Sequence, residues 1–169
     1  MFNNHIISSS VLIGCLTLFS HYAFAVNKPE NNSLKIDKAL LIGQWQCTEA
    51  MEYMGYDAKT QMTVEFKADG QYMENSKLEF ENKDEKANFI AKTKAQWNTD
   101  KDKLTIDHYQ LMHFEADNSS VESKLNLKAA LSDPDAVEMK IKKLTKNEML
   151  ANLILFDEEI EHISRICTR

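Results

Sequence analysis

The sequence predicts an all-β domain, an eight- or nine-stranded antiparallel up-and-down barrel preceded by a short N-terminal helix. From Gly43 onward, apolar and polar residues alternate with a period of two, as expected for strands with one buried face. Short polar turns join these alternating segments, and no long helical crossover separates them. Sequential antiparallel strands in this number close into a barrel or fold into a sandwich.

The elements can be placed in order along the chain. Residues 34–41 predict a short helix, and the alternation of Met62, Val64 and Phe66 ends at Asp69-Gly70, a strong hairpin signal. Further strands are expected over 89–97, 104–114, 121–131, 137–142, 149–156 and 160–168. Residues 125–131 also suit a helix, because Leu and Ala are good helix formers. Residues 47–56 could carry a helical turn as well.

The first 25 residues have the features of an export signal. Residues 6–19 carry no charge, and Ala23-Phe24-Ala25 has the small–x–small pattern of a cleavage site. The apolar stretch is shorter than the roughly 20 residues of a membrane-spanning helix. Lipidation at Cys15 is disfavoured, because apolar rather than polar residues follow it. We expect a signal peptide over 1–25, a flexible lead-in and the start of the helix over 26–38, the barrel over 39–169, and a periplasmic or secreted location.

Two cysteines, Cys47 and Cys167, remain after cleavage at this site. In an exported chain, two cysteines near the ends of the domain favour a disulfide over free thiols or a metal site. Neither has a histidine nearby in the sequence, which argues against a catalytic thiol. A bond between them would tie the first strand to the last.

Two short motifs carry a resemblance to a known family. Gly43-Gln44-Trp45 resembles the Gly-x-Trp that opens the first strand of lipocalin-like (calycin) barrels, and residues 66–72 resemble the F-x-x-D-G-x-Y turn of exported bacterial lipocalin-like domains. The resemblance implies that Trp45 plugs the closed end of a barrel. It also implies that a basic residue of the last strand, Arg165 or Arg169, lies across the indole ring, an arrangement that cation–π attraction favours.

The disulfide would fix a register between the first and last strands. If these strands pair antiparallel with Cys47 opposite Cys167, then Trp45 lies opposite Arg169. In the same register, Arg165 lies opposite Glu49.

The alternation predicts which side chains face the barrel interior. Most are apolar, with small residues that leave space and a few polar groups that could orient a small apolar or amphiphilic ligand. The candidate ligand-binding residues are Glu74, Phe89, Thr93, Trp97, His108, Gln110, Met112 and Phe114. The alternatives are a filled lumen, polar residues at a water-filled barrel end, and a bulge that reverses the faces.

A second hypothesis is a periplasmic inhibitor, immunity or accessory protein that acts through protein–protein contacts. Residues 49–57 are predicted to form a loop rich in the aromatic and methionine side chains that binding surfaces favour. The candidate contact residues are Met51, Tyr53, Met54 and Tyr56. An acidic surface would suit a basic envelope protein as the partner.

Composition and motifs argue against other functions. The chain has 26 acidic and 20 basic residues, a net charge of −6, which makes nucleic acid an unfavourable partner. No second apolar run could span a membrane, and no nucleophile elbow or phosphate-binding loop points to an enzyme or a cofactor. His108 and His113 are five residues apart and so face opposite sides of one strand, which argues against a metal site. We expect a monomer.

Overall fold

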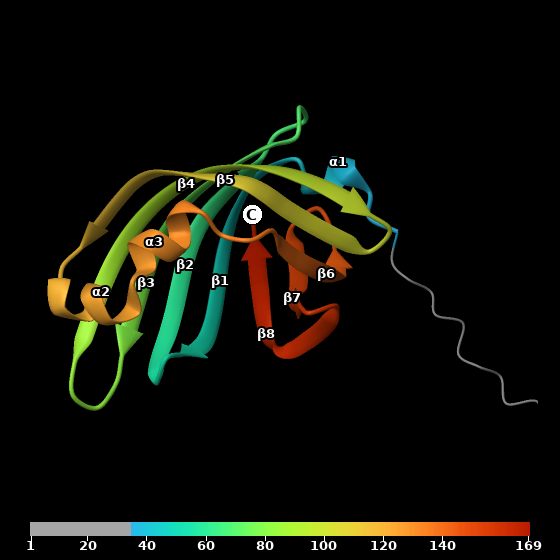
Figure 1. The fold of residues 1–169 in the computed structure, drawn as a ribbon. Helices are drawn as coiled ribbons and strands as arrows, with labels where there is room; N and C mark the ends of the chain where they lie inside the picture. The colour runs from blue at the N-terminus through green and yellow to red at the C-terminus, as the bar shows by residue number, and fades with distance from the viewer. Residues whose placement is uncertain (1–34) are drawn as a thin grey trace, which may run out of the picture. The chain divides into compact units, whose positions relative to one another are not determined.

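The computed structural model describes residues 35–169, and eight antiparallel strands form a closed barrel in chain order (Figure 1). The predicted signal peptide and most of the lead-in lie outside the described residues. The strands are β1 (Gly43–Tyr53), β2 (Tyr56–Phe66), β3 (Gln71–Glu81), β4 (Lys86–Asp100), β5 (Lys103–Ala116), β6 (Val137–Leu144), β7 (Glu148–Leu155) and β8 (Glu158–Thr168). The predicted all-β up-and-down barrel is therefore confirmed, with eight strands rather than nine.

Within residues 35–169, three short helices accompany the barrel: α1 (Lys38–Leu41) before β1, then α2 (Ser119–Leu125) and α3 (Leu127–Ser132) between β5 and β6. The predicted N-terminal helix is confirmed, and within its described residues, 35–41, the helix covers Lys38–Leu41. None of the helices in the described part of the chain is long and apolar enough to cross a membrane.

The strand expected over residues 121–131 is wrong, because this segment forms α2 and α3. The Asn118 side chain accepts hydrogen bonds from the backbone N–H groups of Ser120 and Val121, which caps the start of α2. Asn126 adopts a left-handed conformation (φ 52°) that ends α2. Val121 and Leu125, four residues apart, share one helical face and are buried.

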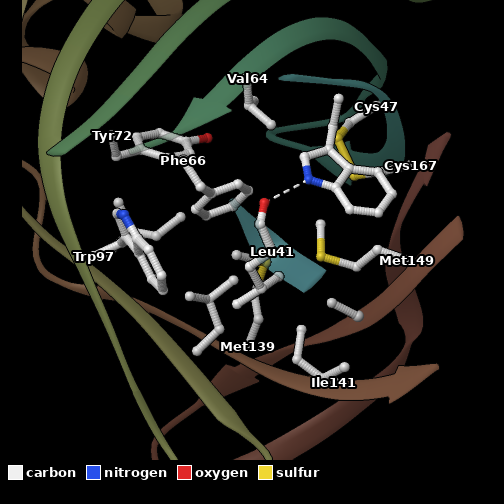
Figure 2. Packing of buried hydrophobic residues seen from close by; sticks show 14 of the residues in the cluster. Leu41, Cys47, Val64, Phe66, Tyr72, Trp97, Met139, Ile141, Met149 and Cys167 are labelled. Atoms are coloured by element: carbon white, nitrogen blue, oxygen red, sulfur yellow. Dashed lines mark hydrogen bonds between the residues drawn. A yellow bond between two sulfur atoms is a disulfide. The ribbon is translucent and has the colours of Figure 1, made fainter. Parts of the chain in front are cut away.

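The first apolar cluster forms the floor of the barrel (Figure 2). Trp45 is completely buried, and its indole N–H donates to the Leu41 carbonyl at 2.8 Å. The Arg169 guanidinium lies 3.8 Å from the centroid of the same ring and also donates to the Leu40 carbonyl. Because Arg169 is exposed to solvent on its outer side, a cation–π contact of this type contributes about 0.5–1 kcal/mol. Arg169 thus contacts both the Trp45 ring and the backbone of helix α1.

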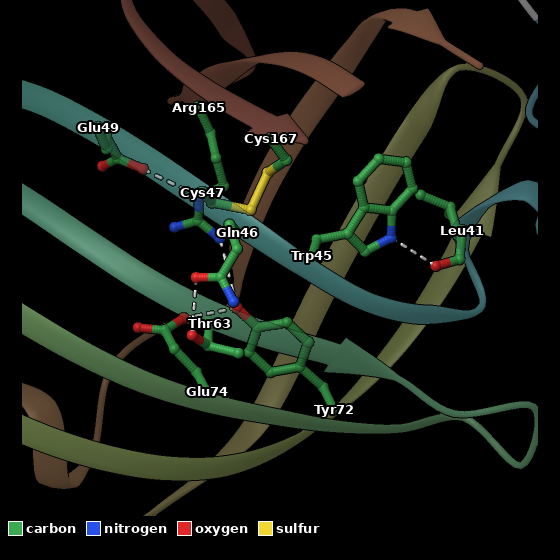
Figure 3. Close-up of a disulfide and its surroundings, with 10 residues drawn as sticks. All are labelled: Leu41, Trp45, Gln46, Cys47, Glu49, Thr63, Tyr72, Glu74, Arg165 and Cys167. Carbon is green, nitrogen blue, oxygen red and sulfur yellow. Dashed lines mark hydrogen bonds and ion pairs between the residues drawn. A yellow bond between two sulfur atoms is a disulfide. The ribbon is translucent and has the colours of Figure 1, made fainter. Parts of the chain in front are cut away.

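The barrel closes between β1 and β8 through only three residue pairs, centred on Cys47 and Cys167. These two cysteines form a disulfide, 120 residues apart in sequence (Figure 3). The expected disulfide is present, and it reinforces a short seam of the barrel.

A second apolar cluster lies toward the opposite end of β1–β5. It includes Phe80 and Phe89 from the sheet and Val121, Leu125 and Leu127 from the two helices. Helices α2 and α3 therefore pack onto the inner face of the sheet at this end.

Strand β5 contains two irregularities that reverse its faces in the middle. Lys92 pairs with His113 but the next residue, Thr93, pairs with Leu111, so Met112 is an extra residue on β5. A second shift, between Lys94 and Gln96, adds another extra residue next to Asp107, where His108 has a φ of +53°. Each bulge moves the following side chains to the other face of the sheet.

Candidate ligand site in the barrel lumen

A polar layer separates the two apolar clusters inside the barrel. On each of β1–β4, at least one inward position between the floor and the second cluster carries a carboxylate or a hydroxyl, and Arg165 of β8 joins them. We name this set the lumen belt; it comprises Glu49, Thr60, Glu74, Ser76, Thr93 and Arg165. Floor residues Tyr72 and Tyr109 border it.

Arg165 of β8 connects β1 and β3 within the barrel interior (Figure 3). Its Nε donates to Glu49 Oε2 at 3.0 Å, and its Nη1 donates to the Tyr72 hydroxyl at 3.4 Å. The Tyr72 hydroxyl in turn donates to Glu74 Oε2 at 2.5 Å. Four side chains from β1, β3 and β8 therefore form one hydrogen-bonded chain.

The environment fixes the ionisation of these groups. Burial and the neighbouring Glu74 charge raise the pKa of Tyr72 well above its usual value. Burial likewise raises the pKa of Tyr109. For Arg165, burial alone would lower the pKa, but the Tyr72 oxygen and the two carboxylates outweigh it and raise the pKa. Both phenols thus remain neutral, and the guanidinium remains charged.

Thr93 supplies a polar group without a protein partner. Its side chain is buried, with 5% of the residue exposed, and within residues 35–169 its Oγ1 atom has no hydrogen-bond partner. It lies directly across the β3–β4 ladder from Glu74 and across β4–β5 from Leu111. A buried hydroxyl left unpaired costs about 1–3 kcal/mol, so this position is a candidate contact for a ligand.

Five of the eight predicted ligand residues face the barrel interior. Glu74 and Thr93 belong to the lumen belt, and Phe89 and Phe114 belong to the second apolar cluster with their ring centroids 5.9 Å apart. Trp97 also faces inward, but it packs in the floor and its indole N–H donates to the Lys67 carbonyl at 2.9 Å.

The inward orientation expected for the other three is wrong. The two bulges of β5 place His108, Gln110 and Met112 on the outside of the barrel. The His108 side chain is 73% exposed, and Met112 is 56% exposed. In their place, Tyr109 and Leu111 face the lumen. Strict period-two alternation does not predict that these two residues face inward. The only sequence signal for the bulge is His108 itself, because histidine is enriched at positive φ.

The loop predicted over residues 49–57 is also wrong. The segment is the end of β1, a tight turn at Met54-Gly55 with positive φ at both positions, and the start of β2. Tyr53 and Tyr56 pack edge-on against Phe80 in the second apolar cluster. Met51 packs against the same cluster, which leaves Met54 as the exposed residue of the four. The segment is therefore a wall of the barrel rather than a contact loop.

A separate groove lies on the outer face of β2–β4, with a volume of about 380 Å³. Its lining includes Lys59, Gln61, Lys77, Asn88 and Ile90. These side chains alternate along the strands with inward ones, and the lining also includes Leu78 and Phe89 of the second apolar cluster.

A closed antiparallel barrel with a sealed floor and a partly polar lumen defines the class of β-barrels built around an internal site. A model of the lipocalin-like domain family matches residues 41–150, more than half of the chain, and the chain belongs to this family. Lipocalin-like proteins are typically binding proteins rather than enzymes. None of the curated proteins compared with the chain matches it.

Proposed function

We propose that this protein is a non-enzymatic binding protein that holds a small amphiphilic molecule in its lumen. The observation that carries the proposal is the unpartnered Thr93 hydroxyl, buried beside Glu74 between two apolar clusters. A ligand with one polar end and an apolar body would satisfy the hydroxyl and cover the aromatic side chains of Phe89 and Phe114.

We further propose that the protein is exported to the periplasm or secreted. The Cys47–Cys167 disulfide supports this location, because disulfides persist in oxidising compartments and are rare in the cytosol. The signal-like composition of residues 1–25 supports it independently.

Native mass spectrometry of the protein, purified gently from the compartment to which its cells deliver it, tests the proposed function. We expect a stoichiometric small-molecule adduct that disappears on denaturation. A chain that carries no small adduct, or that retains a second protein instead, would contradict the proposal and favour the interaction hypothesis.

Two matched variants locate the adduct. Thr93→Val removes the buried hydroxyl with little change of shape, so we expect a protein at least as stable as the wild type that retains less ligand. Thr63→Val makes the same change on the outer face of β2, where the hydroxyl donates to Gln46 at 2.9 Å, and should leave the adduct unchanged. If both variants retain the ligand equally, Thr93 does not contact it.

A further inference from the structure

We propose that the lumen selects ligands that carry a protonated amine, with Glu74 as the group that recognises the charge. This inference rests on the proposed function and names the class of molecule that the same site takes. Three charges meet in the lumen belt: the carboxylates of Glu49 and Glu74 and the guanidinium of Arg165. With both neighbouring phenols neutral, the belt has one negative charge in excess.

The single cation of the belt is paired with Glu49 and Tyr72 through its Nε and Nη1 atoms. Arg165 Nε is 3.0 Å from Glu49 Oε2, and the two side chains are only 11% and 13% exposed. The Nη1 group of Arg165 donates to Tyr72. An anionic ligand would have to break the ion pair with Glu49 or approach two carboxylates, and both routes cost free energy. The existing contacts therefore disfavour an acid as the ligand.

Glu74 is the carboxylate that can accept further hydrogen bonds. Its Oε2 accepts from Tyr72, while its Oε1 receives no hydrogen bond from any residue that the structure describes. Thr93, directly opposite on β4, adds an unpartnered hydroxyl oxygen beside it. An ammonium group is a donor only, with several N–H bonds to give, so a carboxylate oxygen and a hydroxyl oxygen side by side suit it.

The apolar body of such a ligand has a surface to lie on. Leu78 and Phe114 pack against the second apolar cluster and are only half-buried, and Phe89 lies between them in that cluster. Leu111, opposite Thr93, is half-buried too. These side chains continue from the belt toward α2 and α3, so an amine at Glu74 would place an attached chain against them.

Three probes with the same chain and different head groups test the inference: octylamine, 1-octanol and octanoate, titrated into the mature protein by isothermal calorimetry at pH 7. We expect octylamine to bind about tenfold or more tightly than 1-octanol, as a charge-assisted hydrogen bond in a shielded site allows, and octanoate to bind most weakly. Tighter binding of octanoate than of octylamine would overturn the inference while leaving the proposed function intact. No binding of any probe would count against both.

A charge-matched pair of variants assigns the preference to Glu74. Glu74→Gln should lower the affinity for octylamine about tenfold and leave that for 1-octanol unchanged. Glu65→Gln removes the same charge from the exposed outer face of β2 and should change neither affinity. If Glu74→Gln folds poorly, the isosteric Thr93→Val variant gives an independent test. This variant should also reduce the difference in affinity between octylamine and 1-octanol. An octylamine preference that survives both lumen variants would contradict the assignment.

Discussion

Arg165 and Glu49 form an ion pair inside the barrel, with Arg165 Nε 3.0 Å from Glu49 Oε2. They lie two residues from the cysteines of the disulfide, on neighbouring strands, so the bond that closes the barrel also sets the two charges face to face. Paired in this way, the guanidinium can extend to Tyr72 on β3 and stabilise a polar layer within an otherwise apolar interior.

Removing only one partner of this ion pair should be more damaging than removing both. Arg165→Met leaves the Glu49 and Glu74 carboxylates shielded from water without their cation, and we expect the free energy of unfolding in urea to fall by about 3–5 kcal/mol. The double variant Arg165→Met/Glu49→Gln should recover part of that loss. Strictly additive losses in the double variant would show that the pair is not coupled as the geometry indicates.

The disulfide should contribute strongly to stability. It links residues 120 positions apart, and the β1–β8 seam that it crosses has three residue pairs. We expect Cys47→Ala/Cys167→Ala to lower the free energy of unfolding by about 2–5 kcal/mol. Urea denaturation of the wild type in excess reductant provides the control and should reach the value of the variant. Unchanged stability in both experiments would mean that the bond is not formed in the native protein.

The left-handed conformation of His108 predicts an unusual response to substitution. A β-branched residue is strongly disfavoured at a φ of +53°, so His108→Val should lower the free energy of unfolding by about 1–2 kcal/mol although the side chain is exposed. His108→Gly should be neutral or slightly stabilising. Gln110→Val, an exposed position nearby on the same strand, should change stability by less than about 0.5 kcal/mol. Equal effects of the two valine substitutions would contradict the bulge.

Glu159 predicts how stability depends on pH. The hydrogen bond from Lys142, together with those from Asn152 and Lys140, lowers the pKa of Glu159 from 4.5 to about 2. Because the folded-state pKa is depressed, the stabilisation is complete above about pH 4.5 and is lost as the pH falls toward 2.

We expect Glu159→Gln to be about 1 kcal/mol less stable than the wild type at pH 7 and equally stable near pH 2, measured by urea denaturation at each pH. Glu158→Gln, at an exposed neighbouring position, should show no such pH-dependent difference. A difference that stays constant between pH 7 and pH 2 would contradict the assigned ion pairs.

The sequence alone predicted the barrel and its floor because these depend on local patterns. Period-two alternation places the side chains of β4 on the correct faces, from Phe89 to Trp97, and the positions of Cys47 and Cys167 predicted how the first and last strands meet. The register inferred from the cysteines also placed Arg169 at Trp45 and Arg165 at Glu49, where the structure has both contacts.

The middle of β5 and the connection to β6 could not be predicted in this way. The extra residues at His108 and Met112 arise from the pairing of β5 with β4. The alternation within one strand does not specify its register with a neighbouring strand, so these bulges could not be predicted from it. Helices α2 and α3 have apolar residues whose spacing also fits a strand, although residues 125–131 suited a helix as well. The Asn118 side chain caps the start of α2. Likewise, Met54 adopts a positive φ in the turn between β1 and β2. Because methionine rarely does so, the sequence did not indicate a hairpin at this position.

Methyl-resolved NMR of the protein, titrated with the tightest-binding of the three octyl probes, tests most directly whether the lumen is the binding site. We predict chemical-shift changes at the methyl groups of Ala91, Thr93 and Leu111, which face the lumen, and none at Ile90 and Met112 on the outer face. Changes at Ile90 or Met112 with unchanged lumen methyl groups would place the ligand on the outer surface and contradict the account.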